Sequence, residues 1–276
     1  MSGLHTARMG VPGTRPAVLA HCFLGHGGAW PRLIAALKTP LDAVAFDLPG
    51  HGRSAPWDGS GDLLATVAGV FDRLVTEPAL LIGHSFGGAA ALRFAVERPG
   101  RVTGLVLIEP VFFAAATDEP EYAANARAER ALHAAFAAGD MARAAAEFFE
   151  LNGDEAGWSA MPERMRAQII RQMPMVAATV PGLHHDSGDL LAPHRLEALA
   201  APVLLLDGAQ SPPIFGAVTK ALSRRLPKAR QITVAGAGHM LPITHAERVA
   251  GLIDDWIAET QAAPGQGARM PETRAG

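Results

Sequence analysis

The chain has 276 residues, of which 49% are hydrophobic, so it can bury the core of one large α/β domain with an insertion. Its formal charge of -3 and scattered lysines and arginines argue against a nucleic-acid groove or a basic membrane face. A single cysteine excludes an intrachain disulfide, and no apolar run is long enough for a bilayer span. We therefore expect a cytoplasmic protein with a small-molecule substrate and neither nucleic-acid nor membrane partners.

The predicted elements alternate between short apolar strands and helices. Polar residues open the chain and leave room for one short edge strand near residues 4–9. The stronger strand signals lie at residues 17–21, 43–47, 79–82, 102–108, 202–208 and 231–235. Helical spacing covers residues 31–37, 63–74, 86–97, 215–226 and 246–259. This alternation predicts an α/β fold, a mostly parallel sheet with helices on both faces.

One long interval interrupts the alternation. Between residues 111 and 192, alanine, arginine and glutamate recur at helical spacing in residues 119–138, 141–151 and 163–172, and strand-like runs disappear. We interpret this interval as a helical cap (lid) inserted into a core made of residues 1–110 and 193–260. The remaining residues, 261–276, contain proline, glycine and charge without apolar spacing, and we expect them to be disordered.

The sequence Gly83-His84-Ser85-Phe86-Gly87 joins a predicted strand to an alanine-rich helix. A strand that turns into a helix within one residue forces the residue at its tip, Ser85, into a strained conformation. Side chains two positions before or after the tip would strike the neighbouring backbone, which explains the two glycines. The hydroxyl then projects at a helix N-terminus, where developing negative charge is favoured. A plain strand-to-helix turn with an incidental serine has the same spacing.

A nucleophilic serine needs a base and a group that orients the base. His239 follows the last predicted strand in Gly236-Ala237-Gly238-His239, on a loop that can bring an imidazole over the sheet edge. His84 is adjacent to Ser85, but we expect its side chain on the other side of the turn. Three further loop histidines are interpreted as packing or pocket-lining residues: His21, His26 and His51.

An oxyanion needs two preorganised N–H donors. One is expected from the residue after the nucleophile, Phe86, and the other from the loop after the first strong strand. In that loop the residue after His21-Cys22 is Phe23, so we predict its backbone N–H as the second donor. We interpret Cys22 as a small buried hydrophobe, because no partner for a reactive thiol is visible.

Together these segments resemble the α/β-hydrolase superfamily. The elbow around Ser85, residues 47–54 (Asp-Leu-Pro-Gly-His-Gly-Arg-Ser), the His21 loop and the His239 loop occur in its chain order. The resemblance implies an eight-stranded, mostly parallel sheet, a Ser–His–acid triad and a helical cap after the sixth strand. It implies neither a cofactor nor a metal.

Two positions depart from the family's pattern. Most members have His-Gly in the oxyanion loop, where this chain has His21-Cys22. The triad acid usually lies three residues after the glycine that ends the seventh strand, and here that position is Ser211. A neutral hydroxyl cannot stabilise an imidazolium by charge, although it could hydrogen-bond the acid or the histidine.

Two carboxylates are therefore candidates for the acid. Glu109 ends the sixth strand of the family's pattern, which lies between the nucleophile strand and the seventh strand. Certain haloalkane dehalogenases place a glutamate at this point. Asp207 is the alternative. It lies at the end of the seventh strand, closer to the strand than the family's usual acid. We favour Glu109 as the acid. In a purely structural interpretation, Glu109 would be a strand-end carboxylate at the entry to the cap, and Asp207 a turn residue that bonds backbone N–H groups.

Further side chains in the cap could line an apolar acyl pocket or only pack the cap onto the core. These are Phe112, Phe113, Met161, Met165, Met173 and Met175. His184-His185-Asp186 resembles a metal site only superficially, because adjacent residues point to different faces of any regular element.

The sequence favours a serine hydrolase that cleaves a small to medium carboxylic ester, a lactone or a thioester through an acyl-enzyme. Hydrolysis of a carbon–carbon bond in a diketone-type substrate would use the same triad. A hydrolase-fold binding protein with an inactive triad is the third hypothesis, supported by the serine at position 211. Haloalkane dehalogenation needs a carboxylate where Ser85 stands, so we exclude it.

Overall fold

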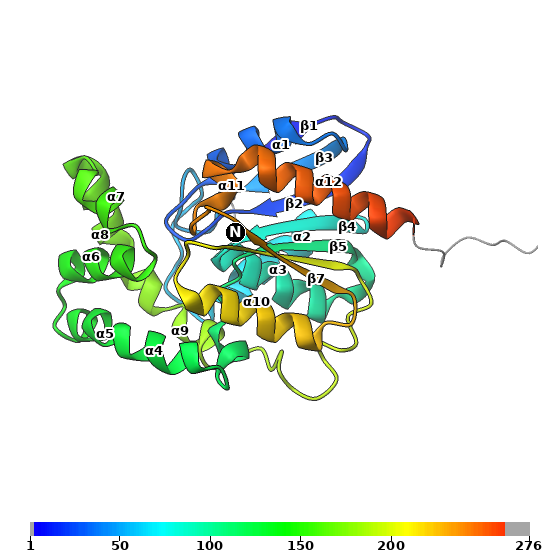
Figure 1. Cartoon of the computed structure of the whole chain (residues 1–276). Coiled ribbons are helices and arrows are strands. Elements are labelled where there is room, and N and C mark those ends of the chain that lie inside the picture. The colour runs from blue at the N-terminus through cyan, green and yellow to red at the C-terminus, as the bar shows by residue number, and fades with distance from the viewer. Residues whose placement is uncertain (1–2, 263–276) are drawn as a thin grey trace, which may run out of the picture.

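The computed structural model describes residues 3–262 and contains one central sheet (Figure 1). Seven strands follow the spatial order β1-β3-β2-β4-β5-β6-β7, and all neighbours are parallel except β1 and β3. The strands are β1 Thr6–Gly10, β2 Arg15–Ala20, β3 Leu41–Phe46, β4 Ala79–His84, β5 Val102–Ile108, β6 Val203–Gly208 and β7 Ala229–Val234. The predicted α/β class and mostly parallel sheet are confirmed.

The strand count is lower than the eight that the resemblance implied. Within residues 3–262 only β1 precedes β2, and it pairs antiparallel with β3 at the sheet edge. The residues ahead of β2 form this one strand and the turn at Pro12-Gly13. The edge strand expected near residues 4–9 is the one that forms.

Helices cover both faces of the sheet. On one face lie α1 Pro31–Ala36, α11 Leu241–Thr244 and α12 Ala246–Ala262, and on the other lie α2 Leu63–Leu74, α3 Phe86–Glu97 and α10 Pro213–Arg225 (Figure 1). Alternate residues of each strand serve the two cores: Leu81 faces α2 and α3, while Leu80 and Ile82 face α12. Strands buried on both sides explain why the sequence shows continuous apolar runs.

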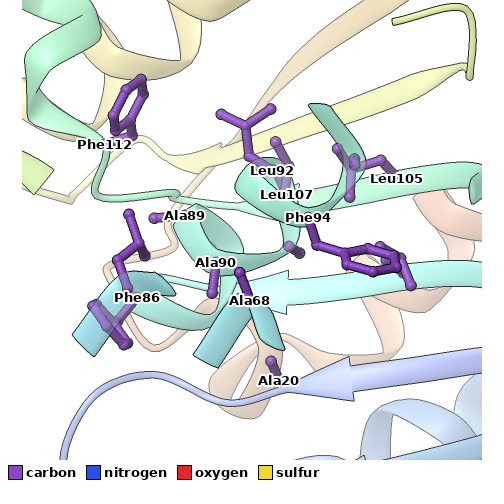
Figure 2. Packing of buried hydrophobic residues seen from close by; sticks show 14 of the residues in the cluster. Ala20, Ala68, Phe86, Ala89, Ala90, Leu92, Phe94, Leu105, Leu107 and Phe112 are labelled. Atoms are coloured by element: carbon purple, nitrogen blue, oxygen red, sulfur yellow. The ribbon is translucent and has the colours of Figure 1, made fainter. Parts of the chain in front are cut away.

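The core around α3 is built from small and large side chains in close contact. Figure 2 shows Ala89 and Ala90 on α3 beside Phe86, with Ala20 at the end of β2 and Ala68 on α2 nearby. Small residues let the helix approach the sheet closely, and the phenyl rings fill the remaining volume. This packing holds the N-terminus of α3, which carries Ser85, firmly against the strand ends.

The interval predicted to be helical contains no strand in the described residues. It holds α4 Pro120–Ala128, α5 Arg130–Ala137, α6 Met141–Leu151, α7 Glu155–Ala160, α8 Glu163–Ala177 and α9 Val180–Leu183. These helices stand to one side of the sheet, beside α10, and have their own small apolar cluster (Figure 1). The division into core and cap at residues 110/111 and 192/193 stays a prediction.

Three short α-helices were not predicted, and the largest differences in bounds fall on two predicted cap helices. Helices α7, α9 and α11 are too short to show a helical period in the sequence. The predicted helix at 119–138 breaks into α4 and α5 at Glu129, and α8 continues through Pro174 because Met173 and Val176 are anchored in the cap cluster.

Helix α12 ends at Ala262, two residues into the tail expected at 261–276. The rest of that predicted tail lies outside the described residues. No helix within residues 3–262 is long and apolar enough to cross a membrane. The cytoplasmic location stays a prediction.

Candidate active site

Ser85 lies at a tight turn between β4 and α3. Its backbone has φ of 56° and ψ of −120°, a strained conformation for a residue with a side chain. A Cβ built on Gly83 would lie 2.5 Å from the carbonyl oxygen of Gly87, and one on Gly87 would lie 2.4 Å from the carbonyl oxygen of Ala20. The predicted reason for glycine at these two positions, a collision with neighbouring backbone, is confirmed.

Three side chains from different parts of the chain meet at this turn. The Nε2 atom of His239 is 3.1 Å from Oγ of Ser85, and its Nδ1 atom is 2.6 Å from Oε2 of Glu109. The glutamate is fully buried and the histidine side chain is 10% exposed. A carboxylate that accepts the Nδ1–H leaves Nε2 free to accept a proton from the serine, which is the arrangement of a general base.

The backbone holds Glu109 in place from two sides. Its own N–H donates to the carbonyl oxygen of Leu206 at 2.8 Å, and Oε1 accepts the N–H of Gly208 at 2.7 Å. Its φ of 45° lies in the left-handed region, which an L-residue adopts at a cost. With one carboxylate oxygen tied to β6, the other faces His239 in a fixed direction.

The alternative acid, Asp207, is committed elsewhere. Its Oδ1 accepts hydrogen bonds from Oγ1 of Thr219 at 2.9 Å and from Nε2 of Gln231 at 3.0 Å. Those partners belong to α10 and β7, so the side chain joins these elements instead of reaching His239. The geometry favours Glu109 over Asp207.

Ser211 occupies the position where the family usually has its acid. Its Oγ is buried and makes no hydrogen bond within residues 3–262, so the suggested bond to the acid or to the histidine is absent there. The atom lies close to Gly208, because a Cβ built on that glycine would be 2.9 Å from it. Ser211 therefore lies near Gly208, whose N–H binds Glu109, and its side chain carries no charge.

His84 anchors the loop that carries His239. Its ring lies 4.9 Å from the His239 ring, and the two residues share a bond of 2.8 Å between Nε2 of His84 and the carbonyl oxygen of His239. Burial lowers the pKa of His84 well below its usual value, so the ring stays neutral and donates Nε2–H. The sequence predicted that the His84 side chain lies on the other side of the turn from Ser85, but it did not predict the hydrogen bond to the His239 loop.

The two residues predicted to supply oxyanion donors lie side by side. The rings of Phe23 and Phe86 meet edge to face at 5.3 Å, and Phe23 also meets His51 at 4.6 Å. Phe86 is the first residue of α3, so its N–H has no partner within the helix. In the described part of the chain, the N–H of Phe23 donates to no backbone acceptor. Their role as oxyanion donors stays a prediction.

A network behind Phe23 fixes its loop. Nε2 of His21 accepts the N–H of Leu48 at 2.9 Å, and its Nδ1 donates to the carbonyl oxygen of Cys22 at 2.7 Å. Burial lowers the pKa of His21 to about 3, so this neutral ring is a structural link. Oδ1 of Asp47 accepts the N–H of Gly27, which ties the same two loops together. Burial raises the pKa of Cys22 to about 12, which fits an unreactive buried thiol.

Phe215 is a neighbour of His239 that the sequence did not reveal. The two rings are stacked, with centroids 4.5 Å apart and planes 13° from parallel. Phe215 lies on α10, and nothing in its spacing distinguishes it from an ordinary core phenylalanine. A phenyl face stabilises a positively charged ring above it, so Phe215 is placed to support His239 when it holds the proton.

Replacing Phe215 with leucine is expected to lower kcat on a short ester by about 2- to 30-fold, because the stacking face is lost. The KM for a short ester should change less, since such a substrate need not fill the space beside the ring. The measurement is steady-state kinetics, with thermal unfolding to show that the variant is folded. Ile214→Val, which changes a neighbouring cavity residue, is the control. An equal fall in kcat for both variants would assign the effect to the cavity wall.

A cavity of about 450 Å³ opens at Ser85 between the sheet edge and the cap. Both predicted oxyanion residues, Phe23 and Phe86, line it. Of the six side chains considered for an acyl pocket, only Phe113 lines this cavity; Phe112 and Met173 are fully buried in apolar clusters, and Met165 is exposed. Most of the other lining residues come from the cap helices and their ends, among them Glu129, Leu132, His133 and Phe136 at helical spacing.

The side chains of His184 and Asp186 have contacts within the protein. His184 lines the cavity and faces Glu129, while the carboxylate of Asp186 accepts the N–H groups of Leu190 and Leu191. Within residues 3–262, histidine, cysteine, aspartate and glutamate form no group of three or more that could hold a metal ion.

A parallel sheet with a serine at a nucleophile elbow, a histidine beyond the last strand and a cavity under inserted helices defines the class of α/β-hydrolase-fold proteins. The model of the "Alpha/beta hydrolase family" matches residues 17–252, so the chain belongs to that family.

Relatives of known name match the chain at moderate identity. The lipase LipV of Mycobacterium tuberculosis is 39% identical over 110 residues, covering 39% of this chain and 41% of the lipase. A pimeloyl-[acyl-carrier protein] methyl ester esterase of Neisseria meningitidis is 30% identical over 258 residues, covering 88% of this chain and 94% of the esterase. In several other relatives the matched region spans 63% or less of their length.

Solved structures share the fold. A thermophilic esterase from Thermogutta terrifontis superposes with a TM-score of 0.64 at 26% identity, covering 93% of both chains. MenH from S. aureus superposes with a TM-score of 0.67 at 18% identity, covering 95% of this chain and 100% of its own, and shows the fold alone.

Proposed function

We propose that this protein is a serine hydrolase that cleaves small to medium carboxylic esters, including lactones or thioesters, through an acyl-enzyme. The continuous hydrogen-bonded path from Glu109 through His239 to Ser85 carries this proposal, with its two contacts of 2.6 and 3.1 Å. The names of the relatives that are esterases and a lipase support the choice of an ester bond.

In the proposed reaction, Oγ of Ser85 attacks the ester carbonyl while Nε2 of His239 takes the hydroxyl proton. The carboxylate of Glu109 holds Nδ1–H and stabilises the imidazolium, and the N–H groups of Phe23 and Phe86 stabilise the oxyanion. Collapse of the tetrahedral intermediate breaks the bond to the alcohol oxygen, which receives the proton from His239. Water, deprotonated by His239, then releases the acid and restores Ser85. The chemistry uses only these groups and water.

The cavity supports a substrate of limited size. Its volume of about 450 Å³ accommodates an acyl chain or a small ring beside Ser85, and most of its lining is apolar. Burying apolar substrate surface there contributes about 25 cal/mol for each Å² removed from water, so longer acyl chains should bind more tightly until the cavity is full.

The test is a fluorophosphonate probe followed by a panel of esters, thioesters, lactones and one diketone-type substrate. We expect the probe to add covalently to the peptide that contains Ser85, as located by mass spectrometry, and turnover to be highest on one ester class. Absence of labelling in folded protein would support the inactive binding protein instead. Turnover of the diketone without turnover of esters would support carbon–carbon bond hydrolysis.

A further inference from the structure

The cavity that opens at Ser85 also contains a polar cluster, which we call the distal cluster: Asn125, Glu129, His133 and His184. Oε1 of Glu129 is 3.7 Å from Nε2 of His184, beyond hydrogen-bond distance. Both side chains are largely buried, with exposures of 12% and 15%. A buried carboxyl group costs free energy unless its oxygens are paired, so its place in a largely apolar cavity needs an explanation.

The other polar residues of the same wall are already satisfied by their own helices. Nδ2 of Asn152 donates to the carbonyl oxygen of Phe148 at 2.7 Å, and Oγ1 of Thr179 donates to the carbonyl oxygen of Val176 at 2.7 Å. These two side chains are therefore part of helix ends. Glu129 has Asn125, one helical turn earlier, as a hydrogen-bond partner, and no hydrogen bond of 3.5 Å or less joins its side chain to His184.

His184 does not neutralise Glu129 by charge. Burial lowers the pKa of His184 to about 4, so its imidazole is uncharged at neutral pH. Burial also raises the pKa of Glu129, while a hydrogen bond from the Asn125 side chain and the charge of His133 lower it by smaller amounts. Among the described residues that line the cavity, none is a lysine or an arginine. Glu129 thus faces the cavity as an acceptor that burial has partly deprived of water.

A row of aromatic contacts connects the cluster to the proposed nucleophile. His239 stacks on Phe215 at 4.5 Å, Phe215 meets Phe113 at 6.4 Å, and Phe113 meets His184 at 4.8 Å. Three of these rings, Phe113, His184 and Phe215, line the cavity together with Ser85 and Glu129. An acyl chain bound to Ser85 along these rings would bring its far end to the distal cluster.

We propose that the cavity selects acyl chains that carry a hydrogen-bond donor, such as a hydroxyl or an amino group, at their far end, and that Glu129 is the acceptor that recognises it. This inference rests on the proposed ester hydrolysis for its kinetic readout. A terminal methyl group gives the remaining acceptor sites of Glu129 no partner, and a terminal carboxylate meets another carboxyl group with no lysine or arginine among the described lining residues. Sites built to bind a polar group reject analogues that lack it far more strongly than apolar pockets discriminate by size.

The experiment compares methyl esters of unsubstituted, ω-hydroxy, ω-amino and ω-carboxy acids over a series of chain lengths. At one chain length we expect kcat/KM for the ω-hydroxy or ω-amino ester to exceed that of the unsubstituted ester by at least about tenfold. The Glu129→Leu variant should lose this preference, and Glu129→Gln, which keeps an acceptor, should retain part of it. Asn152→Leu is the matched control and should retain the whole preference.

Methyl acetate separates the two proposals, because its acyl group is too short to reach Glu129. Turnover of methyl acetate by both wild type and Glu129→Leu, with no preference among the longer esters, would overturn the distal-cluster inference and leave the proposed function standing. If no ester is turned over, binding to the Ser85→Ala protein decides the inference. Calorimetry should then show tighter binding of alkane-1,ω-diols than of alkanols of equal length, and equal affinities would overturn it.

Discussion

Replacing Ser85 with alanine is expected to lower kcat on the best ester by about 10⁴-fold or more, because the atom that forms the acyl-enzyme is removed. The remaining turnover over water would come from substrate binding and the oxyanion donors. The strained backbone at this position, with φ of 56°, is unchanged by the substitution, since alanine keeps the same Cβ. Loss of activity should therefore occur without loss of folding, as measured by kinetics and thermal unfolding side by side.

Ser211→Ala is the matched control for this experiment. Its hydroxyl is buried near the same strand ends, makes no hydrogen bond within the described residues and has no proposed role in the reaction. We expect its kcat to stay close to that of the wild type. Turnover by Ser85→Ala at the wild-type rate would remove Ser85 as the nucleophile, whatever the behaviour of the control.

Replacing Glu109 with glutamine is expected to lower kcat by about 10³- to 10⁴-fold. The amide oxygen can keep the bond to the N–H of Gly208, which turns the amide nitrogen toward Nδ1 of His239. That nitrogen donates a proton, so His239 must carry its own proton on Nε2 and can no longer accept one from Ser85. The effect should appear in kcat, with KM nearly unchanged, because Glu109 is fully buried behind the histidine.

Two further variants assign the acid. Asp207→Asn should leave kcat close to wild type, because Asp207 bonds Thr219 and Gln231 instead of the histidine. Adding Ser211→Asp to Glu109→Gln should recover at least about tenfold in kcat, since a carboxylate there lies beside Gly208 and restores a charge near His239. A collapse of kcat in Asp207→Asn, with Glu109→Gln unaffected, would transfer the role to Asp207.

The sequence predicted much of the fold because its strands are buried on both faces. Continuous apolar runs are distinctive, and the strand Val102–Ile108 and the helices Leu63–Leu74 and Met141–Leu151 have the predicted bounds. The predicted eight strands were wrong by one, because that number came from the family pattern and not from residues with strand spacing. Helices of four to six residues, such as α9 and α7, contain too few turns to show a period.

The residues of the site that could be predicted are those that follow directly after a strand of the parallel sheet. Parallel strands bring their carboxyl ends to one edge, so Ser85, Glu109 and His239 could be expected together from their places after β4, β5 and β7. Contacts between helices and loops are not fixed in this way. The stacking of Phe215 on His239, the anchoring bond from His84 and the distal cluster depend on how α10 and the cap helices pack, which spacing does not reveal.

The proposed acid, Glu109, follows β5, whereas the family's usual acid lies in the loop that corresponds to the one after β6. Glu109 belongs to the turn that leaves β5, one residue before Pro110, and the loop after β6 carries no group that the proposed reaction uses. A chimera that receives its lid from another hydrolase must therefore be joined after Glu109, or it inherits a donor chain without the carboxylate. The loop after β6 supports this arrangement through its backbone, because the N–H of Gln210 donates to the carbonyl oxygen of Ala237 in the His239 loop at 2.8 Å.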